Sequence, residues 1–142
     1  MIKLRHVGIT VVDIERSLTF YRDLLGFKIH RDMEESGNYI DNFSGIKDIK
    51  VRTCKMTASD GSMIELLQYR SHPGKARQKL ITVIGCSHFA LTVDDLDTLY
   101  RKLTDSGVNF NSEPQFSPDK YAKIAFCKDP DGILIELVQE LK

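Results

Sequence analysis

The sequence predicts an α+β fold made of two similar βαβββ modules, and three observations lead to this prediction. The motif D-G-x-x-I-E-L-x-Q occurs twice, at 60–68 and again at 131–139. A histidine-led apolar segment also occurs twice, as HVGITV at 6–11 and as HFALTV at 88–93. An acidic turn and a helical pattern follow each histidine segment, so both halves carry their motifs in the same order.

The first half opens with a strand and a helix. Residues 2–11 alternate in polarity, which predicts a half-buried strand with His6 among small residues on one face. Asp13 is placed to cap a helix that ends at Gly26. The helix carries an apolar stripe of Ile14, Leu18, Tyr21, Leu24 and Leu25.

The second half repeats this arrangement. His88 shares a strand face with Ala90 and Thr92, and Asp94 or Asp95 can begin the helix that Gly107 ends. Its apolar stripe is Leu96, Leu99, Tyr100 and Leu103.

Three further strands are expected in each half, and Asp-Gly pairs at 60–61 and 131–132 predict hairpin turns. The expected strands are 27–33, 49–58 and 62–70 in the first half, and 108–112, 122–128 and 133–140 in the second. Pro73 and Gly74 break the first half's last strand. We therefore expect one domain over 1–142, with module one at about 1–70, a linker at 71–84 and module two at about 85–142.

The composition excludes several classes of function. Twenty Lys and Arg balance twenty Asp and Glu, whereas a nucleic-acid binder needs a basic surface. The apolar stretches are too short to span a membrane, and the N-terminus has no secretory signal pattern. The three cysteines are widely spaced and odd in number, which suits reduced thiols. A cytoplasmic protein that acts on a small molecule is expected.

Four residues of the repeated motifs form a candidate metal site. Glu65 and Glu136 lie among apolar strand residues, where a carboxylate is costly unless it is paired or binds a cation. His6 and His88 occupy matching positions in the two halves. Two imidazoles and two carboxylates suit Zn, Ni, Co, Mn or Fe(II). The alternative is a structural role, with core histidines and with the two buried glutamates paired to each other.

Several motifs resemble the vicinal oxygen chelate superfamily, which includes glyoxalase I (lactoylglutathione lyase), bleomycin-type resistance proteins and dioxygenases. They are H-V-G-I-T-V-x-D at 6–13, F-Y-x-x-x-L-G-F at 20–27, S-H-F-A-L-T-V-D-D at 87–95 and D-P-D-G-x-x-I-E-L at 129–137. The resemblance covers nearly the whole chain. It implies that the modules curl into an open, eight-stranded, barrel-like cleft around the metal, and that the protein forms a homodimer.

The resemblance also implies a chemistry. His6, Glu65, His88 and Glu136 fall on the family's four metal-ligand positions, and the full set is similar to that of bacterial glyoxalase I. Such enzymes are metal-dependent lyases or isomerases that move a proton next to a metal-bound carbonyl through an enediolate. By resemblance, Glu136 is the first choice for the base and Glu65 the second.

Two alternatives accompany this prediction. Thr10 and Tyr69 stand where bacterial glyoxalase I usually has an Arg and an Asn that help to bind glutathione, so the resemblance leaves the substrate open. The H-V-G-I-T-V opening is closer to methylmalonyl-CoA epimerases, although these usually have Gln at the position of Glu65. A protein of another class, which binds an antibiotic without metal, usually lacks the ligand set.

Overall fold

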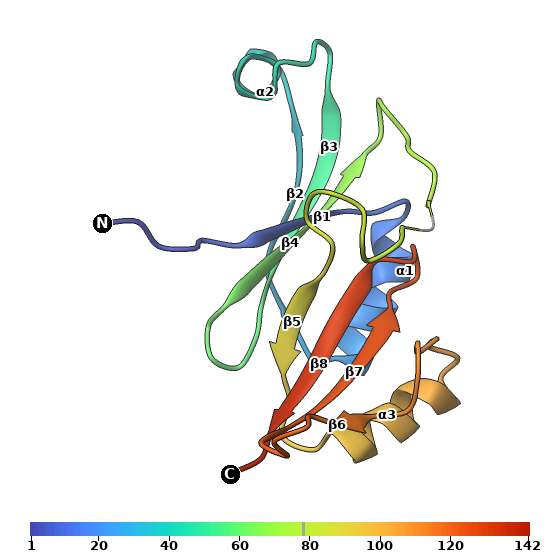
Figure 1. Cartoon of the computed structure of the whole chain (residues 1–142). Coiled ribbons are helices and arrows are strands. Elements are labelled where there is room, and N and C mark those ends of the chain that lie inside the picture. The colour runs from blue at the N-terminus through green and yellow to red at the C-terminus, as the bar shows by residue number, and fades with distance from the viewer. Residues whose placement is uncertain (78) are drawn as a thin grey trace. The chain divides into compact units, whose positions relative to one another are not determined.

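The computed structural model describes residues 1–77 and 79–142, and it divides into two compact units, 1–76 and 77–142. Each unit contains one four-stranded sheet (Figure 1). The boundary between the units falls inside the predicted linker at 71–84, of which residue 78 lies outside the described residues.

The first unit has the strand order β1-β4-β3-β2, with β1 parallel to β4 and the other neighbours antiparallel. Its elements are β1 (Val7–Thr10), α1 (Ile14–Leu18), the π-helical turn η1 (Thr19–Leu24), β2 (Lys28–Ser36), α2 (Asn38–Ser44), β3 (Lys50–Thr57) and β4 (Met63–Tyr69).

The second unit repeats this topology in the order β5-β8-β7-β6, again with its first strand parallel to its last. Its elements are β5 (Phe89–Thr92), α3 (Leu96–Asp105), β6 (Gln115–Phe116), β7 (Ala122–Lys128) and β8 (Leu134–Glu140). The predicted pair of βαβββ modules is confirmed, with α2 as an additional helix in the first.

The predicted helix starts are confirmed. The carboxylate of Asp13 accepts a hydrogen bond from the backbone N–H of Glu15, and that of Asp95 accepts one from Thr98. Gly26 has a φ of 83° just after the first helical segment, in the left-handed region that glycine tolerates. Five residues of the two predicted apolar stripes are almost fully buried: Ile14, Leu18, Tyr21, Leu96 and Leu103.

The hairpin turns are also as predicted. Gly61 and Gly132 have φ values of 86° and 84°, a conformation that residues with a Cβ rarely adopt. In the second turn one carboxylate oxygen of Asp129 accepts the backbone N–H groups of Asp131 and Ile133, at 2.8 and 2.9 Å. These turns align β3 with β4 and β7 with β8, and so fix the register of both glutamate strands.

Three elements differ from the prediction. The first strand begins at Val7 rather than at residue 2, because β4 begins at Met63 and the residues before 6 have no neighbour to pair with. The strand predicted at 108–112 is reduced to a single bridge between Phe110 and Cys127, and β6 lies further along the chain.

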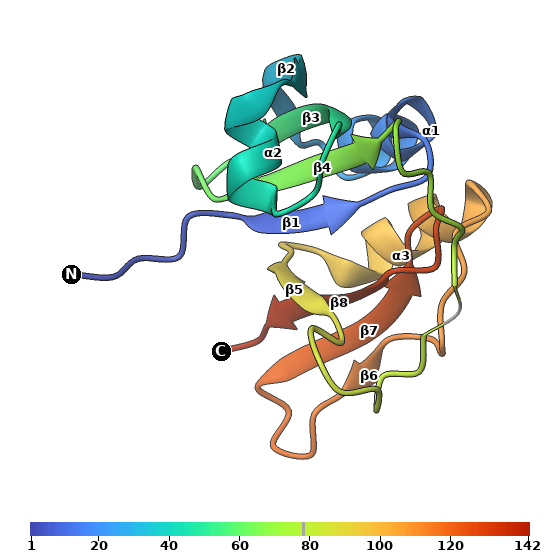
Figure 2. The same cartoon turned by 90° about the horizontal axis from the view of Figure 1, so that it is seen from above.

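The third difference is α2, which the sequence pattern did not predict. Ile40 on this helix is buried against Ile49 and Val51, with Leu67 and Tyr69 packed beside them. Leu67 and Tyr69 lie two and four residues after Glu65 on β4, so α2 covers one end of the sheet face that carries this carboxylate (Figure 2).

The residues that the structure describes contain no helix with the length and apolar character needed to cross a membrane. All three cysteines are free: Cys54 and Cys127 are buried, and Cys86 is exposed.

Candidate metal centre

The duplicated motifs place a histidine beside a glutamate in each unit. The first strand of each sheet runs parallel to the strand that carries the glutamate, and each histidine lies two residues before the partner of that glutamate. The paired positions are Gly8 with Glu65 and Ala90 with Glu136. Because side chains two residues apart share a strand face, each imidazole is directed to the same face as its carboxylate.

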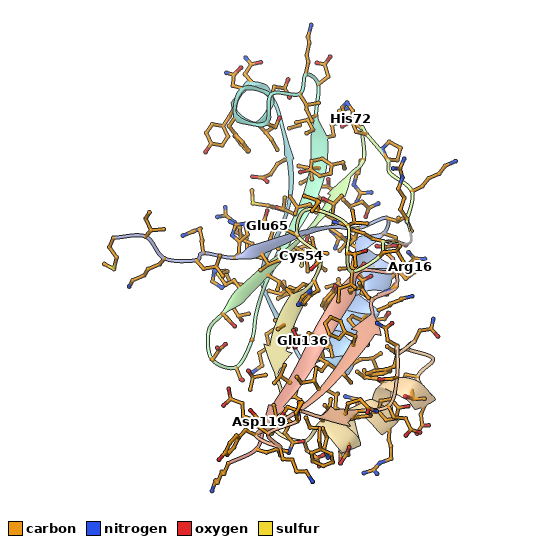
Figure 3. The ribbon with its side chains drawn as sticks, viewed as in Figure 1. Arg16, Cys54, Glu65, His72, Asp119 and Glu136 are labelled. Carbon is orange, nitrogen blue, oxygen red and sulfur yellow. The ribbon has the colours of Figure 1, made fainter. Side chains whose placement is uncertain are left out.

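In the first unit, Nε2 of His6 lies 3.7 Å from Oε2 of Glu65. The Glu65 side chain is 12% exposed, and that of His6 is 29% exposed. Ile64 and Leu66, the neighbours of Glu65 on β4 (Figure 3), are buried on one face of the sheet, so the carboxylate lies on the other face.

In the second unit, Nε2 of His88 lies 3.1 Å from Oε2 of Glu136. The other ring nitrogen, Nδ1, lies 2.8 Å from the hydroxyl oxygen of Ser87. The Phe126 ring meets the imidazole edge to face, with ring centroids 5.0 Å apart. The imidazole is therefore held at both nitrogens and along its side, which fixes its orientation.

These separations suit two ligands of one metal ion. Nitrogen and oxygen ligands bind such ions at about 2.0–2.2 Å, so neighbouring ligands lie about 3.0–3.4 Å apart in octahedral or tetrahedral geometry. The His88–Glu136 distance of 3.1 Å falls within that range, and the His6–Glu65 distance of 3.7 Å is slightly wider. The donor types and spacing fit a divalent transition metal.

The structure brings together His6 with Glu65 and His88 with Glu136, as two separate pairs. Within the described ranges 1–77 and 79–142, no group of three or more His, Cys, Asp or Glu side chains is placed to hold a metal ion. The convergence of both pairs on one ion therefore stays a prediction.

The two pairs differ on the strand next to the glutamate. Lys55 on β3 stands opposite Glu65, and its Nζ lies 3.8 Å from Glu65 Oε2. Phe126 on β7 holds the equivalent position opposite Glu136. The first carboxylate therefore has a cation for a neighbour, whereas the second has an aromatic ring.

The buried cysteines are poor candidates for chemistry. Burial raises the pKa of the Cys54 thiol to about 11 and that of the Cys127 thiol to about 12. Both thiols are thus protonated at neutral pH, whereas the thiolate is the form that attacks carbon centres and binds metals.

A second repeated residue, the final Gln of D-G-x-x-I-E-L-x-Q, also has a role that the sequence reasoning missed. The side-chain oxygen of Gln68 accepts the backbone N–H of Ile14 at 3.0 Å, and that of Gln139 accepts the N–H of Leu96 at 2.9 Å. Each glutamine thus ties the strand of its glutamate to the first residue of the preceding helix. The presence of this glutamine in both copies of the motif was the sequence signal that could have indicated its role.

The two positions that depart from the glutathione pattern lie in different surroundings. Thr10 is exposed at the end of β1. Tyr69 is partly buried and packs against the cluster of Ile40, Ile49 and Val51 beneath α2. Neither residue supplies the cation or amide that those positions hold in bacterial glyoxalase I.

Comparisons with known proteins give relatives along almost the whole chain. A probable lactoylglutathione lyase of Vibrio parahaemolyticus is 31% identical over 138 residues, covering 96% of this chain and 90% of its own. A probable lactoylglutathione lyase of Synechocystis is 32% identical over 137 residues, covering 96% of this chain and 94% of its own.

The fold has close counterparts among solved structures. A glyoxalase family protein from Bacillus cereus matches with a TM-score of 0.90 at 23% identity, over 100% of this chain and 96% of that one. The sequence profile of the Glyoxalase/Bleomycin resistance protein/Dioxygenase superfamily matches residues 3–137. With the repeated topology and the two His–Glu pairs, these matches show that the chain belongs to this superfamily.

Proposed function

We propose that the protein is a metal-dependent lyase or isomerase of the glyoxalase type, which transfers a proton next to a carbonyl group. The observation that carries the proposal is the His–Glu pair, which occurs at the same register position in both sheets. Relatives named as lactoylglutathione lyases, at about 30% identity, support it.

His6, Glu65, His88 and Glu136 are the residues that would hold the metal, in a homodimeric protein of the cytoplasm. A divalent ion, when bound, supplies a Lewis acid that stabilises negative charge on the substrate's oxygen atoms. The chain's own residues would then orient the substrate and carry the proton.

Glu136 is the proposed base, with Glu65 as the second choice. A carboxylate in a partly buried site can accept a proton from a carbon next to a carbonyl and return it to the same or the neighbouring carbon. Glu136 Oε2 is 3.1 Å from His88 and faces Phe126, with no lysine opposite it. Glu65 Oε2 lies 3.8 Å from the Lys55 ammonium, a neighbour that Glu136 does not have opposite it.

The Glu136→Gln variant tests this role. It keeps the shape of the side chain and removes the proton acceptor, so we expect turnover to fall by at least about a hundredfold with the fold unchanged. Turnover is measured with methylglyoxal plus glutathione and, separately, with methylmalonyl-CoA. Glu140→Gln, at the exposed end of the same strand, is the matched control.

The two assays also distinguish a lactoylglutathione lyase from the alternative isomerase, a methylmalonyl-CoA epimerase. Thr10 and Tyr69 stand where bacterial glyoxalase I usually binds glutathione with an Arg and an Asn, so a CoA thioester is tested beside the glutathione adduct. Activity of Glu136→Gln equal to that of the unaltered protein on its substrate would refute the role of Glu136. If the protein binds an antibiotic without a metal and is inactive in both assays, the proposed enzyme activity is refuted.

A further inference from the structure

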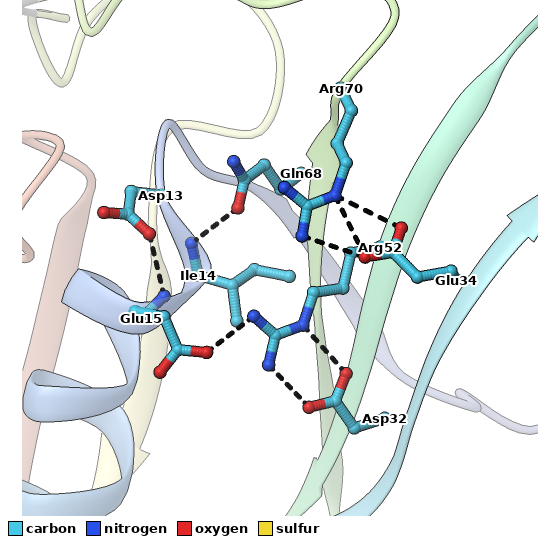
Figure 4. A network of polar contacts seen from close by, with 8 residues as sticks. All are labelled: Asp13, Ile14, Glu15, Asp32, Glu34, Arg52, Gln68 and Arg70. Carbon is cyan, nitrogen blue, oxygen red and sulfur yellow. Dashed lines mark hydrogen bonds and ion pairs between the residues drawn. The ribbon is translucent and has the colours of Figure 1, made fainter.

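The charged side chains of β2 are divided between the two faces of its sheet. Asp32 stands opposite Cys54, and Glu34 stands opposite Arg52, on the face turned away from Glu65. Arg52 donates to both carboxylate oxygens of Asp32, at 3.0 and 2.7 Å, and Arg70 binds Glu34 (Figure 4). The acids on that face are therefore already neutralised by arginines.

The opposite face of β2 carries cations. Arg31 stands opposite Lys55, which in turn stands opposite Glu65, so all three share one face of the sheet. Lys28 stands opposite Thr57, which faces Met63 two residues before Glu65. Lys28, Arg31 and Lys55, which we call the cationic row, thus lie on the face that carries the His6–Glu65 pair.

A β-bulge produces this arrangement. The register shifts between Ile29 and Arg31, so that one extra residue is inserted in β2. In an unbroken ladder His30 would stand opposite Lys55, and the bulge brings Arg31 there instead. Bulges often redirect a side chain beside a functional site.

The face that carries the cationic row has more cations than carboxylates. Three cations share the face with Glu65, and the next carboxylate on that face, Glu35, is bound by the Thr53 hydroxyl at 3.3 Å. Among the residues described, the side chains of Lys28 and Arg31 have no hydrogen bond or ion pair. Like charges directly opposite each other destabilise a sheet, which indicates a function that repays the cost.

The second unit differs at the residue beside its glutamate, since Phe126 occupies the position that matches Lys55. Lys128, opposite Leu134, lies on the same face of β7 but two residues away from Phe126. A cation directly opposite the glutamate is thus a feature of the first unit.

We infer that the cationic row is an anion subsite for a carboxylate or phosphate group of the substrate. Neighbouring strands are about 5 Å apart, so Lys55 and Arg31 lie about one and two strand spacings from Glu65. The inference rests on the proposed function for the reacting carbonyl, and it narrows the substrate class. The substrate is an anionic carbonyl compound whose charged group binds beside the Glu65 carboxylate.

Calorimetric titration of the metal-free protein tests this inference, with inorganic phosphate and malonate as separate probes. We expect at least one probe to bind, more weakly as salt rises, and its dissociation constant to increase about tenfold in Lys55→Met and in Arg31→Met. Lys50→Met is the matched control, because Lys50 is exposed on the same strand but on the opposite face. Tighter binding of phosphate than malonate would identify a phosphate group, and the reverse a carboxylate.

If neither probe binds to the unaltered protein, the proposed anion subsite is refuted. It is also refuted if Lys50→Met weakens binding as much as Lys55→Met and Arg31→Met do. Circular dichroism spectra establish that each variant is folded. Because the titration uses neither metal nor turnover, its result is independent of the Glu136→Gln assay. Failure of the subsite and failure of the proposed enzyme activity are thus separate outcomes.

Discussion

At the scale of single residues, Arg52 connects three elements of the first unit. Its guanidinium on β3 binds Asp32 on β2 and, at 2.6 Å, Glu15 on α1 (Figure 4). The side chain is only 17% exposed. The hydrogen bond from Arg52 lowers the pKa of Asp32 below its usual value of 3.8. A lowered carboxyl pKa in the folded state means that ionised Asp32 stabilises the fold.

We expect Arg52→Met to lower the free energy of unfolding by about 1–2 kcal/mol at neutral pH, because it removes charge-assisted hydrogen bonds from a mostly buried side chain. The contribution of Asp32 is full above pH 3.8 and is lost as the pH falls through its lower folded-state pKa. The difference between the two proteins should therefore shrink in acid. Urea unfolding at about pH 7 and about pH 3 measures it.

Arg22→Met is the control for this prediction. Arg22 binds the adjacent residue, Asp23, in an exposed pair, and such pairs contribute little to stability. A loss in Arg52→Met no larger than that in Arg22→Met would show that the three-element contact is not a stabilising one.

The candidate site also shows what single residues reveal in the sequence. His6, Glu65, His88 and Glu136 could be identified because each occurs in a motif that is present twice. Lys55 has no repeated counterpart, and Arg31 reaches the Glu65 face through a bulge. The sequence alone does not reveal this bulge, because β2 is mostly exposed and polar and so has no apolar alternation in which a one-residue shift would show.

At the scale of elements, the strands with clear patterns and the capped helices were predicted, and elements defined by packing were not. The helix α2 has seven residues between Gly37 and Gly45, too few for a helical repeat to show in the sequence. It is held by burial of Ile40, and by Asp41, whose carboxylate accepts the backbone N–H groups of Asp48 and Ile49. Both contacts depend on residues that folding brings near.

The glutamines of the repeated motif give a prediction at this scale. Replacing Gln68 or Gln139 by Leu leaves the first N–H group of α1 or α3 without its partner, which should cost about 1 kcal/mol of unfolding free energy in each case. Thermal or urea unfolding of the two variants measures the loss.

Gln115→Leu is the control, since Gln115 is exposed and its amide only contacts the backbone oxygen of Glu113. The two motif variants should lose similar amounts of stability, because their hydrogen bonds have nearly the same length and position. Stability unchanged in both would mean that water replaces the glutamine at the helix start.

At the scale of the whole molecule, duplication explains why so much of the fold was predictable. Both units use the same strand order, the same capped helix start and the same Asp-Gly hairpin, so each half serves as a check on the other. The sequence contains no comparable signal for whether the two His–Glu pairs share one ion, because this depends on how modules pair and not on local patterning.

Metal binding by the full chain tests whether one ion is held by both His–Glu pairs. If one ion uses both pairs, the protein should bind one metal ion per chain, and either His6→Ala or His88→Ala should remove most of it, since each takes away one of four ligands. Metal content after dialysis, together with the rise in melting temperature on adding metal, provides two independent measurements.

His72→Ala serves as the control, because His72 lies in the exposed segment after β4 and its imidazole is hydrogen-bonded to the Ser71 hydroxyl, away from both His–Glu pairs in the sequence. Two ions per chain, with one lost in each histidine variant, would mean that each His–Glu pair binds its own ion. One ion that survives in one variant and disappears in the other would assign the metal to a single module. In either case the duplicated pairs would not share one ion. In the second case, the proposed base would have to be sought in the module that binds the metal.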